Sequence, residues 1–253
     1  MEISERSWVG YINALRKVND KATAEILKWL KKRGIPQSRE AMNALIDFAY
    51  AVSTKYGEAA AELAAEMYET TAALSGVVIE PAVPAAAPEI GEVAKTVVGT
   101  AKLQNEEIIS SAVGRLVKQT GVDTTILNAL RDGAEWAWIP HGETCAFCIM
   151  LASNGWQRAS KKALKGGHAE HIHANCDCTY AIRFDSSSNV AGYDPDKYFE
   201  MYSNADGNRS KDKLNSMRRD FYAENSEEIN AQKRDNYEKR KERESSAAEE
   251  TDV

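Results

Sequence analysis

Four cysteines gather within one short stretch of this chain, in spacings that suit metal binding. They form a C-x-x-C pair and a C-x-C pair, Cys145 with Cys148 and Cys176 with Cys178. A C-x-x-C turn holds two thiolates close together, and tetrahedral zinc binds sulfur at about 2.3 Å. The second pair follows the first after a loop long enough to fold back and complete the ligand shell. The pattern predicts one structural zinc ion per chain.

Three histidines lie just before the second cysteine pair and compete for the same metal. His173 belongs to the run His173-Ala-Asn-Cys176-Asp-Cys178, whereas His168 and His171 follow a pair of glycines. Structural zinc takes four ligands, and His173 with the four cysteines makes five candidates. We expect Cys145 and Cys148 to bind together with two of the other three. His168 and His171 are expected to be exposed loop residues.

A pair of disulfides is the alternative explanation of the four cysteines. The N-terminus, MEISERSW, lacks a basic region followed by an apolar run, so a secretory signal is not expected. Thiols of a protein that is not exported stay reduced, which favours metal over disulfides.

The sequence around these cysteines resembles a known family. WIPHGETCAFCIMLASNGW followed by HIHANCDCTYAIRF is similar to the cysteine-histidine region of phage minor head proteins of the Mu F type, most specifically over residues 135–184. His173 stands where the histidine of that family stands. The resemblance implies a virion protein inside the head near the portal, present in the host cytoplasm during assembly. It implies a role in head assembly, genome packaging or ejection, with the portal protein and capsid subunits as partners.

Composition sets the outer limits of function. The net charge is −6, with 43% hydrophobic and 28% charged residues, as in an ordinary soluble protein. No global basic field draws the chain onto nucleic acid, so contact with packaged DNA would be local. No run approaches 18 consecutive apolar residues, so no membrane partner is expected.

Apolar periodicity predicts a mainly α protein with a helical N-terminal half. Residues 5–33 form one amphipathic helix, and a second helix runs from Ser38 to about Ser75, with Gly57 as a possible break. Three prolines make residues 77–91 an extended connector. The chain then divides into an N-terminal helical region (1–76), this connector (77–91), helices with the zinc module (92–203) and a charged tail (204–253).

Within the third region we expect a helix from Val93 to Gly121 and another from Thr124 to Trp136, capped by Asp123. Residues 179–184 alternate and are rich in β-formers, which predicts a strand with Trp138-Ile139 as its partner. Asp194 and Pro195 begin a short helix. The fold class is therefore mainly α with a small zinc-stapled α+β module and a disordered or helical charged tail.

Catalytic motifs are missing from the sequence. It has no phosphate-binding loop, no dinucleotide fingerprint, no nucleophile elbow and no H-E-x-x-H. Five candidate ligands for four coordination positions indicate a zinc ion with no position open to substrate or water, whereas a catalytic zinc keeps one open. We therefore expect a non-enzymatic structural protein. The alternative is a zinc-stapled nuclease of the HNH-like type acting on DNA, in which His168, His171 or His173 would serve catalysis.

Overall fold

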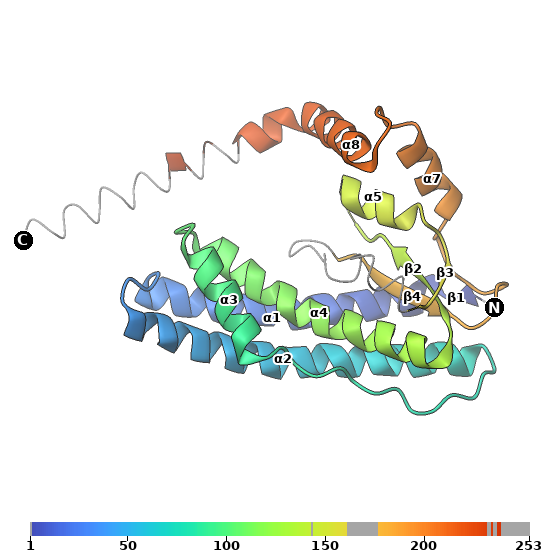
Figure 1. The fold of residues 1–253 in the computed structure, drawn as a ribbon, viewed down its shortest axis with the longest axis horizontal. Coiled ribbons are helices and arrows are strands. Elements are labelled where there is room, and N and C mark those ends of the chain that lie inside the picture. Colours follow the sequence, from blue (N-terminus) through green and yellow to red (C-terminus); the bar gives the residue numbers. More distant parts are fainter. Residues whose placement is uncertain (1, 143, 161–176, 232–233, 235–236, 239–253) are drawn as a thin grey trace, which may run out of the picture.

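A computed structural model describes residues 2–142, 144–160, 177–231, 234 and 237–238 of the chain. The protein is mainly helical, with a small β-sheet. Long helices form one layer, the sheet lies above one end of it, and short helices cover the other side of the sheet (Figure 1). The predicted mainly α fold with a small α+β part is confirmed, while the zinc in that part stays a prediction.

Helix α1 spans Glu5–Arg33, as the periodicity predicted. The side chain of Ser4 caps it by accepting a hydrogen bond from the Ser7 N–H at 3.2 Å. The helix ends at Gly34, whose φ of 73° lies in the left-handed region that favours glycine. Its buried face includes Ile12, Ile26 and others at three- and four-residue steps, which explains why one side packs inward.

Helix α2 spans Arg39–Leu74 and crosses α4 (Glu106–Asp132) at very close range. Gly57 does not interrupt α2. A Cβ on Gly121 of α4 would lie only 3.2 Å from the Ala60 carbonyl oxygen of α2. The small residues at this crossing therefore let the two backbones approach, and a larger side chain at position 121 would push the helices apart.

The predicted boundary between the helices of the third region is wrong in two places. Helix α3 spans Ile90–Ala101 and ends before a short turn, and α4 begins after Asn105, whose side chain accepts from the Ile108 N–H at 2.9 Å. No break occurs at Gly121 or Asp123. The Asp123 carboxylate accepts a hydrogen bond from Gln119 at 2.8 Å, one turn earlier in the same helix, rather than capping a new one. Trp136 lies in a strand, not at a helix end.

The proline-rich connector lies against the helices that it joins. The Asn128 amide of α4 donates to the Val83 carbonyl and accepts from the Val83 N–H, both at 2.9 Å. Thr124 accepts from the Ala85 N–H at 2.9 Å, and Glu69 of α2 accepts from the Ala82 N–H at 2.8 Å. Because prolines cannot form a backbone ladder, these side chains supply its hydrogen bonds. The division of the chain at residues 77–91 stays a prediction.

A three-stranded antiparallel sheet lies between α4 and the short helix that follows Cys145. Strand β2 (Glu135–Ile139) lies at its centre, between β3 (Gln157–Arg158) and β4 (Thr179–Arg183). The predicted strand after Cys178 and its predicted partner are both confirmed, with Trp138 opposite Tyr180. An ion pair between Glu135 and Arg183 at 2.6 Å closes one end of the pairing. A separate parallel pair joins β1 (Glu2–Ile3) to β5 (Asn189–Val190).

Short helices complete the fold on the far side of the sheet. They are α5 (Ala146–Ala152), α7 (Pro195–Ser203) and α8 (Ser210–Glu224). Asp194 caps α7 as predicted. The Lys213 ammonium of α8 donates to the carbonyls of Ser203 at 2.6 Å and Ala205 at 3.0 Å, which ties α8 to the end of α7. Part of the predicted charged tail is thus helical, and residues 239–253 lie outside the described residues.

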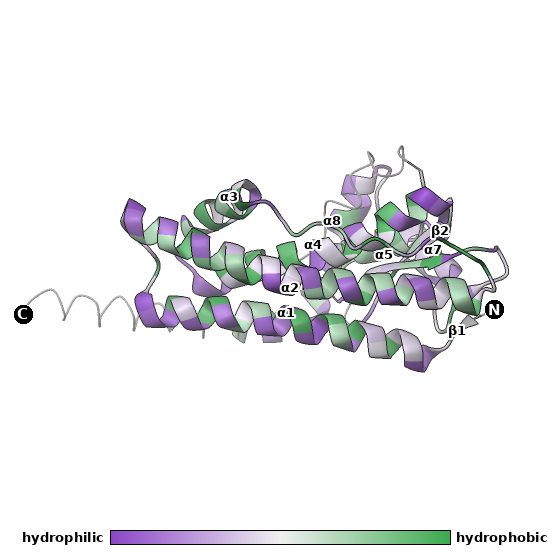
Figure 2. Cartoon of the chain, turned by 90° about the horizontal axis from the view of Figure 1, so that it is seen from below, coloured by the Kyte–Doolittle hydropathy of each residue, from purple (hydrophilic) through white to green (hydrophobic). Residues whose placement is uncertain are grey.

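The buried side chains form two clusters. One lies among α1, α2, α3 and α4, and includes Ile26, Leu45 and Val113. The other joins the opposite ends of α1 and α4 to the sheet and α5. Figure 2 shows the long helices with apolar segments (green) alternating with polar ones (purple). Among the described helices, none combines the length and the apolar character needed to cross a bilayer.

The contacts of Asn128 lead to a first prediction. Asn128→Ala leaves the Val83 N–H and C=O without their partner and should lower the free energy of unfolding by about 1–3 kcal/mol. Urea denaturation measures the loss, and limited proteolysis should cut the variant within residues 77–89 sooner than the unaltered chain. Leu127→Ala, at an exposed neighbouring position, is the control and should change the stability little. Equal stability of both variants would contradict this role of Asn128.

Candidate metal centre

The C-x-x-C pair stands at the start of helix α5. Cys145 is the N-cap residue, with an extended backbone at φ −72° and ψ 160°, and Cys148 is the third residue of the helix. N-cap and N3 side chains lie close together across the first helical turn, which is the basis of the capping box. Cys148 is buried, with 1% of its surface exposed, and Cys145 is half-buried. The local fold therefore suits two sulfur ligands of one ion.

Cys178 lies immediately before strand β4, beside the loop that leads to the C-x-x-C pair. The pairing of Ile139 with Thr179 places residues 140 and 141 next to Cys178. The His141 N–H donates to the Cys178 Sγ at 3.4 Å. Backbone N–H groups that point at sulfur stabilise a thiolate, the form that binds metal. Sequence reasoning missed His141, and no local signal could have found it, because the contact is made by its backbone N–H after β2 has paired with β4.

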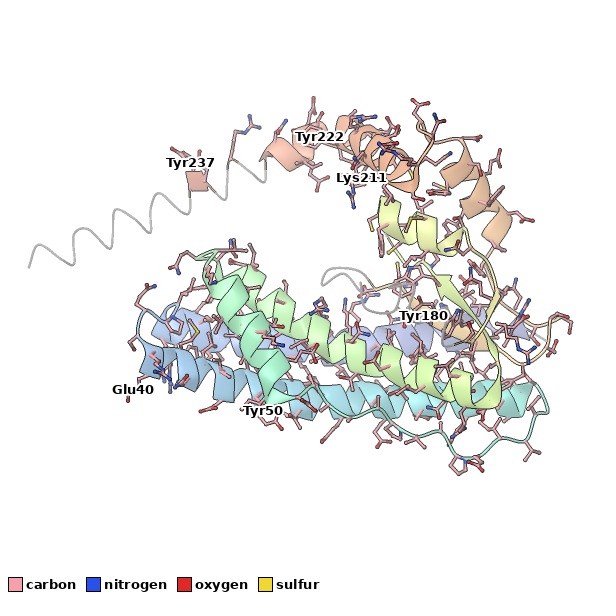
Figure 3. All side chains as sticks on the ribbon, viewed as in Figure 1. Glu40, Tyr50, Tyr180, Lys211, Tyr222 and Tyr237 are labelled. Carbon is pink, nitrogen blue, oxygen red and sulfur yellow. The ribbon has the colours of Figure 1, made fainter. Side chains whose placement is uncertain are left out.

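The three described cysteines share one apolar environment. Cys148 and Cys178 belong to the buried cluster around the sheet, and Cys145 packs against it. Trp136 and Trp138 lie in the same cluster on one face of β2, with their rings 5.7 and 4.9 Å from the Tyr180 ring. Figure 3 labels Tyr180 within the sheet. Such a setting disfavours uncompensated charge, so thiolates there need a cation.

Asp177 anchors the segment that enters β4, next to Cys178, to the helical layer. Its carboxylate pairs with the Arg16 guanidinium of α1 at 3.2 Å and with the Lys118 ammonium of α4 at 3.5 Å. In an extended backbone, neighbouring side chains point to opposite sides. Asp177 can therefore face the two cations while Cys178 faces the sheet cluster. The alternation of Cys and Asp in residues 176–178 indicates from sequence that the two kinds of side chain face opposite ways. Which cations face Asp177 depends on the tertiary fold.

Two tyrosines connect α7 to the cysteine region. The Tyr193 hydroxyl donates to the Ala152 carbonyl at the end of α5, at 2.8 Å. Its ring stacks with that of Tyr198 at 6.2 Å. Burial raises the pKa of Tyr198, and the nearby Cys178 and Asp194 raise it further. Helix α7 therefore brings a neutral hydroxyl, not a charge, close to Cys178.

The remaining candidate ligands are His173 and Cys176, and both lie outside the described residues, as do His168 and His171. Within the part of the chain that the structure describes, no group of three or more His, Cys, Asp and Glu side chains is gathered to hold a metal. Cys145, Cys148 and Cys178 offer the donor type that zinc prefers, and His173 and Cys176 would complete the set. The zinc site stays a prediction.

Comparison with known proteins places the chain in a phage family. The family model described as VG15 protein matches residues 2–205, and the chain belongs to this family. It is therefore a phage protein. No curated protein and no solved structure matches the chain.

The positions of the three described cysteines lead to a second prediction. The purified, reduced chain should carry one zinc ion, measured by elemental analysis together with thiol titration. Structural zinc contributes on the order of 10 kcal/mol to folding, so Cys148→Ser should lose zinc and unfold residues around α5 and β4. Most of the helical circular dichroism signal should remain, because the cluster formed by α1, α2, α3 and α4 is separate.

Ser153→Ala serves as the control for that substitution, because its side chain lies at the other end of α5. It should keep full zinc content. A zinc-free chain with two disulfides by mass spectrometry would contradict the metal site and favour the disulfide alternative.

Proposed function

We propose that this phage protein is a minor head protein of the Mu F type that acts near the portal vertex. The observation that carries the proposal is the family match over residues 2–205, which covers the whole cysteine-histidine region. The order C-x-x-C, then H-x-x-C-x-C, then an apolar strand is the order seen in those head proteins. In this chain the strand is β4, paired with β2.

In this proposal, zinc is a structural staple. The sheet has only short strands, and β3 contributes two residues. Small units with few strands seldom hold together by apolar burial alone, and a metal supplies the missing stability. Cys145, Cys148 and two of His173, Cys176 and Cys178 would hold it. The ion would join the start of α5 to the start of β4, which are otherwise linked through the Cys178–His141 contact.

The proposed role needs no catalysis by this chain. Instead, the long helical layer supplies rigid surface for the portal protein and capsid subunits, and local positive groups could touch packaged DNA. The short helices expose apolar side chains. Phe199 of α7 is 59% exposed, and Phe221 of α8 is 48% exposed. Exposed aromatic side chains of this kind are typical of protein–protein contacts. These surfaces suit a protein that joins other head components.

A paired experiment tests the function. Tagged protein from infected cells should recover the portal protein and should be found in purified virions or procapsids. The same preparation, incubated with plasmid DNA and Mg²⁺, Mn²⁺ or Zn²⁺, should leave the DNA intact. A double variant, Phe199→Ala with Phe221→Ala, should recover less portal protein if the short helices form the contact.

The opposite outcome would support a nuclease instead. DNA cleavage that disappears in His168→Ala, His171→Ala or His173→Ala, with no portal protein recovered, would overturn the proposal. His141→Ala is the matched control for these histidines, because the contact of His141 with Cys178 is made by backbone atoms and survives the substitution.

A further inference from the structure

The end of the helical layer that lies away from the sheet is basic. The loop from α1 to α2 and the turn from α3 to α4 meet there (Figure 1), and the Gln37 side chain donates to that of Gln104 at 3.2 Å. Residues 28–40 and 102–107 form this basic end and carry six exposed cations and three carboxylates. The cations are Lys28, Lys31, Lys32, Arg33, Arg39 and Lys102. The local charge is therefore positive, although the net charge of the whole chain is −6.

Contacts within the chain do not neutralise these cations. None of the six forms an ion pair or a side-chain hydrogen bond with the described residues. The three carboxylates are Glu40, Glu106 and Glu107, and Figure 3 labels Glu40 at this end. Each carboxylate lies in the first turn of a helix, where the helix dipole stabilises negative charge. Their place is thus explained by α2 and α4 themselves, and the cations are left to solvent.

The helix dipole accounts for only some of the cations. Lys31, Lys32 and Arg33 lie in the last turn of α1, where positive charge is favoured. Lys28 lies earlier in α1, and Arg39 is the first residue of α2, where the dipole disfavours a cation. A residue placed against a local preference is typical of a functional surface. Arg39 therefore indicates that this end binds something outside the fold.

Aromatic rings hold one of the cations in position. The Arg33 guanidinium lies over the Trp29 ring, 4.9 Å from its centroid, and Trp29 stacks on Phe48 of α2 at 6.1 Å. Arg33 is nevertheless exposed. A guanidinium held on a ring loses less side-chain entropy when it binds an anion, and its planar fork matches the geometry of phosphate. Arg33 is thus a preorganised phosphate-binding group.

The composition of the basic end favours a polyanion over a protein partner. Protein interfaces are depleted in lysine and centre on apolar and aromatic side chains. Four of the six cations here are lysines, and within residues 28–40 and 102–107 Leu103 is the one large apolar side chain that is exposed. Such a surface suits a ligand whose negative charge repeats along a backbone.

We propose that the basic end binds the phosphate backbone of double-stranded DNA. The cations of residues 28–33 lie along about 8 Å of α1, and one DNA strand presents a phosphate about every 3.4 Å along its axis. Contacts from Lys and Arg to phosphate position a protein on DNA but carry no sequence information. Binding is therefore independent of sequence. The choice of DNA as the polyanion rests on the proposed function, which places the protein beside the packaged genome.

Fluorescence anisotropy of the full chain with a labelled DNA duplex tests the site. If about four cations contact phosphates, raising the salt from about 50 mM to about 200 mM should weaken binding about a hundredfold. Two duplexes of unrelated sequence should bind with equal affinity. No binding at the lower salt concentration, or a strong preference for one sequence, would overturn the proposal.

Removal of charge from the basic end identifies the surface. A triple variant with Lys31→Gln, Lys32→Gln and Arg39→Gln should raise the dissociation constant at least about tenfold at about 0.1 M salt. The slope of log Kd against log salt concentration should fall by about two to three, since three phosphate contacts are lost. Arg39→Gln alone should weaken binding without lowering the stability in urea, because it removes a cation from a helix N-terminus. Weaker binding by that single variant therefore does not come from unfolding.

The matched control removes the same charge elsewhere. Lys17→Gln, Lys21→Gln and Lys211→Gln alter exposed residues outside the basic end. Lys17 and Lys21 lie on the same helix, at least about 15 Å along it from Lys31. That separation exceeds the screening length of about 10 Å at 0.1 M salt. The control should change the dissociation constant less than about threefold, and equal weakening by both triple variants would overturn the site.

The proposed function and this site fail in different ways. Recovery of the portal protein by a chain that does not bind DNA would overturn this site alone. DNA binding by a chain that recovers no portal protein would overturn the proposed function alone. If the unaltered chain does not bind DNA and the triple variant at the basic end loses the portal protein, this surface binds an acidic protein, and the DNA site is overturned.

Discussion

The pairing of β2 with β4 is the contact on which the cysteine region depends. It joins Glu135–Ile139 to Thr179–Arg183 and so brings together two parts of the chain that are about 40 residues apart. Long-range pairing of this kind is entropically costly. Burial of both faces offsets that cost here, because most side chains of the two strands are buried. Through this pairing Cys178 comes to lie beside the loop that leads to Cys145.

The helical layer gives this sheet a fixed place. Asp177 is held by Arg16 of α1 and Lys118 of α4, so the segment that enters β4 is attached to two helices. The helices themselves are close because small residues meet at the crossing of α2 and α4. The layer therefore acts as a support, and the cysteine region is a small addition at one of its ends.

Local signals predicted much of this fold. Helix α1, the strand β4 with its partner and the start of α7 follow from periodicity, turn residues and caps. The error at Gly121 and Asp123 arose because those residues are typical breakers and caps in isolation. In the structure Gly121 serves close packing with Ala60 instead. Tertiary packing overrides local preference at such points.

The candidate site likewise has features that the sequence predicts and contacts that only the folded chain creates. The C-x-x-C and C-x-C spacings indicated the metal chemistry without any structure. By contrast, the contact of His141 with Cys178 and the two cations around Asp177 depend on elements that meet only in the folded chain. No local pattern marks such partners, because their positions along the chain carry no periodic signal.

Zinc K-edge X-ray absorption on the reduced protein tests the central claim most directly, because it reports the atoms bound to the ion. A shell with at least two sulfur atoms at about 2.3 Å, completed by sulfur or imidazole nitrogen, is the result we predict. A shell of oxygen and nitrogen without sulfur would mean that the metal is held elsewhere, and it would contradict a zinc staple formed by Cys145 and Cys148.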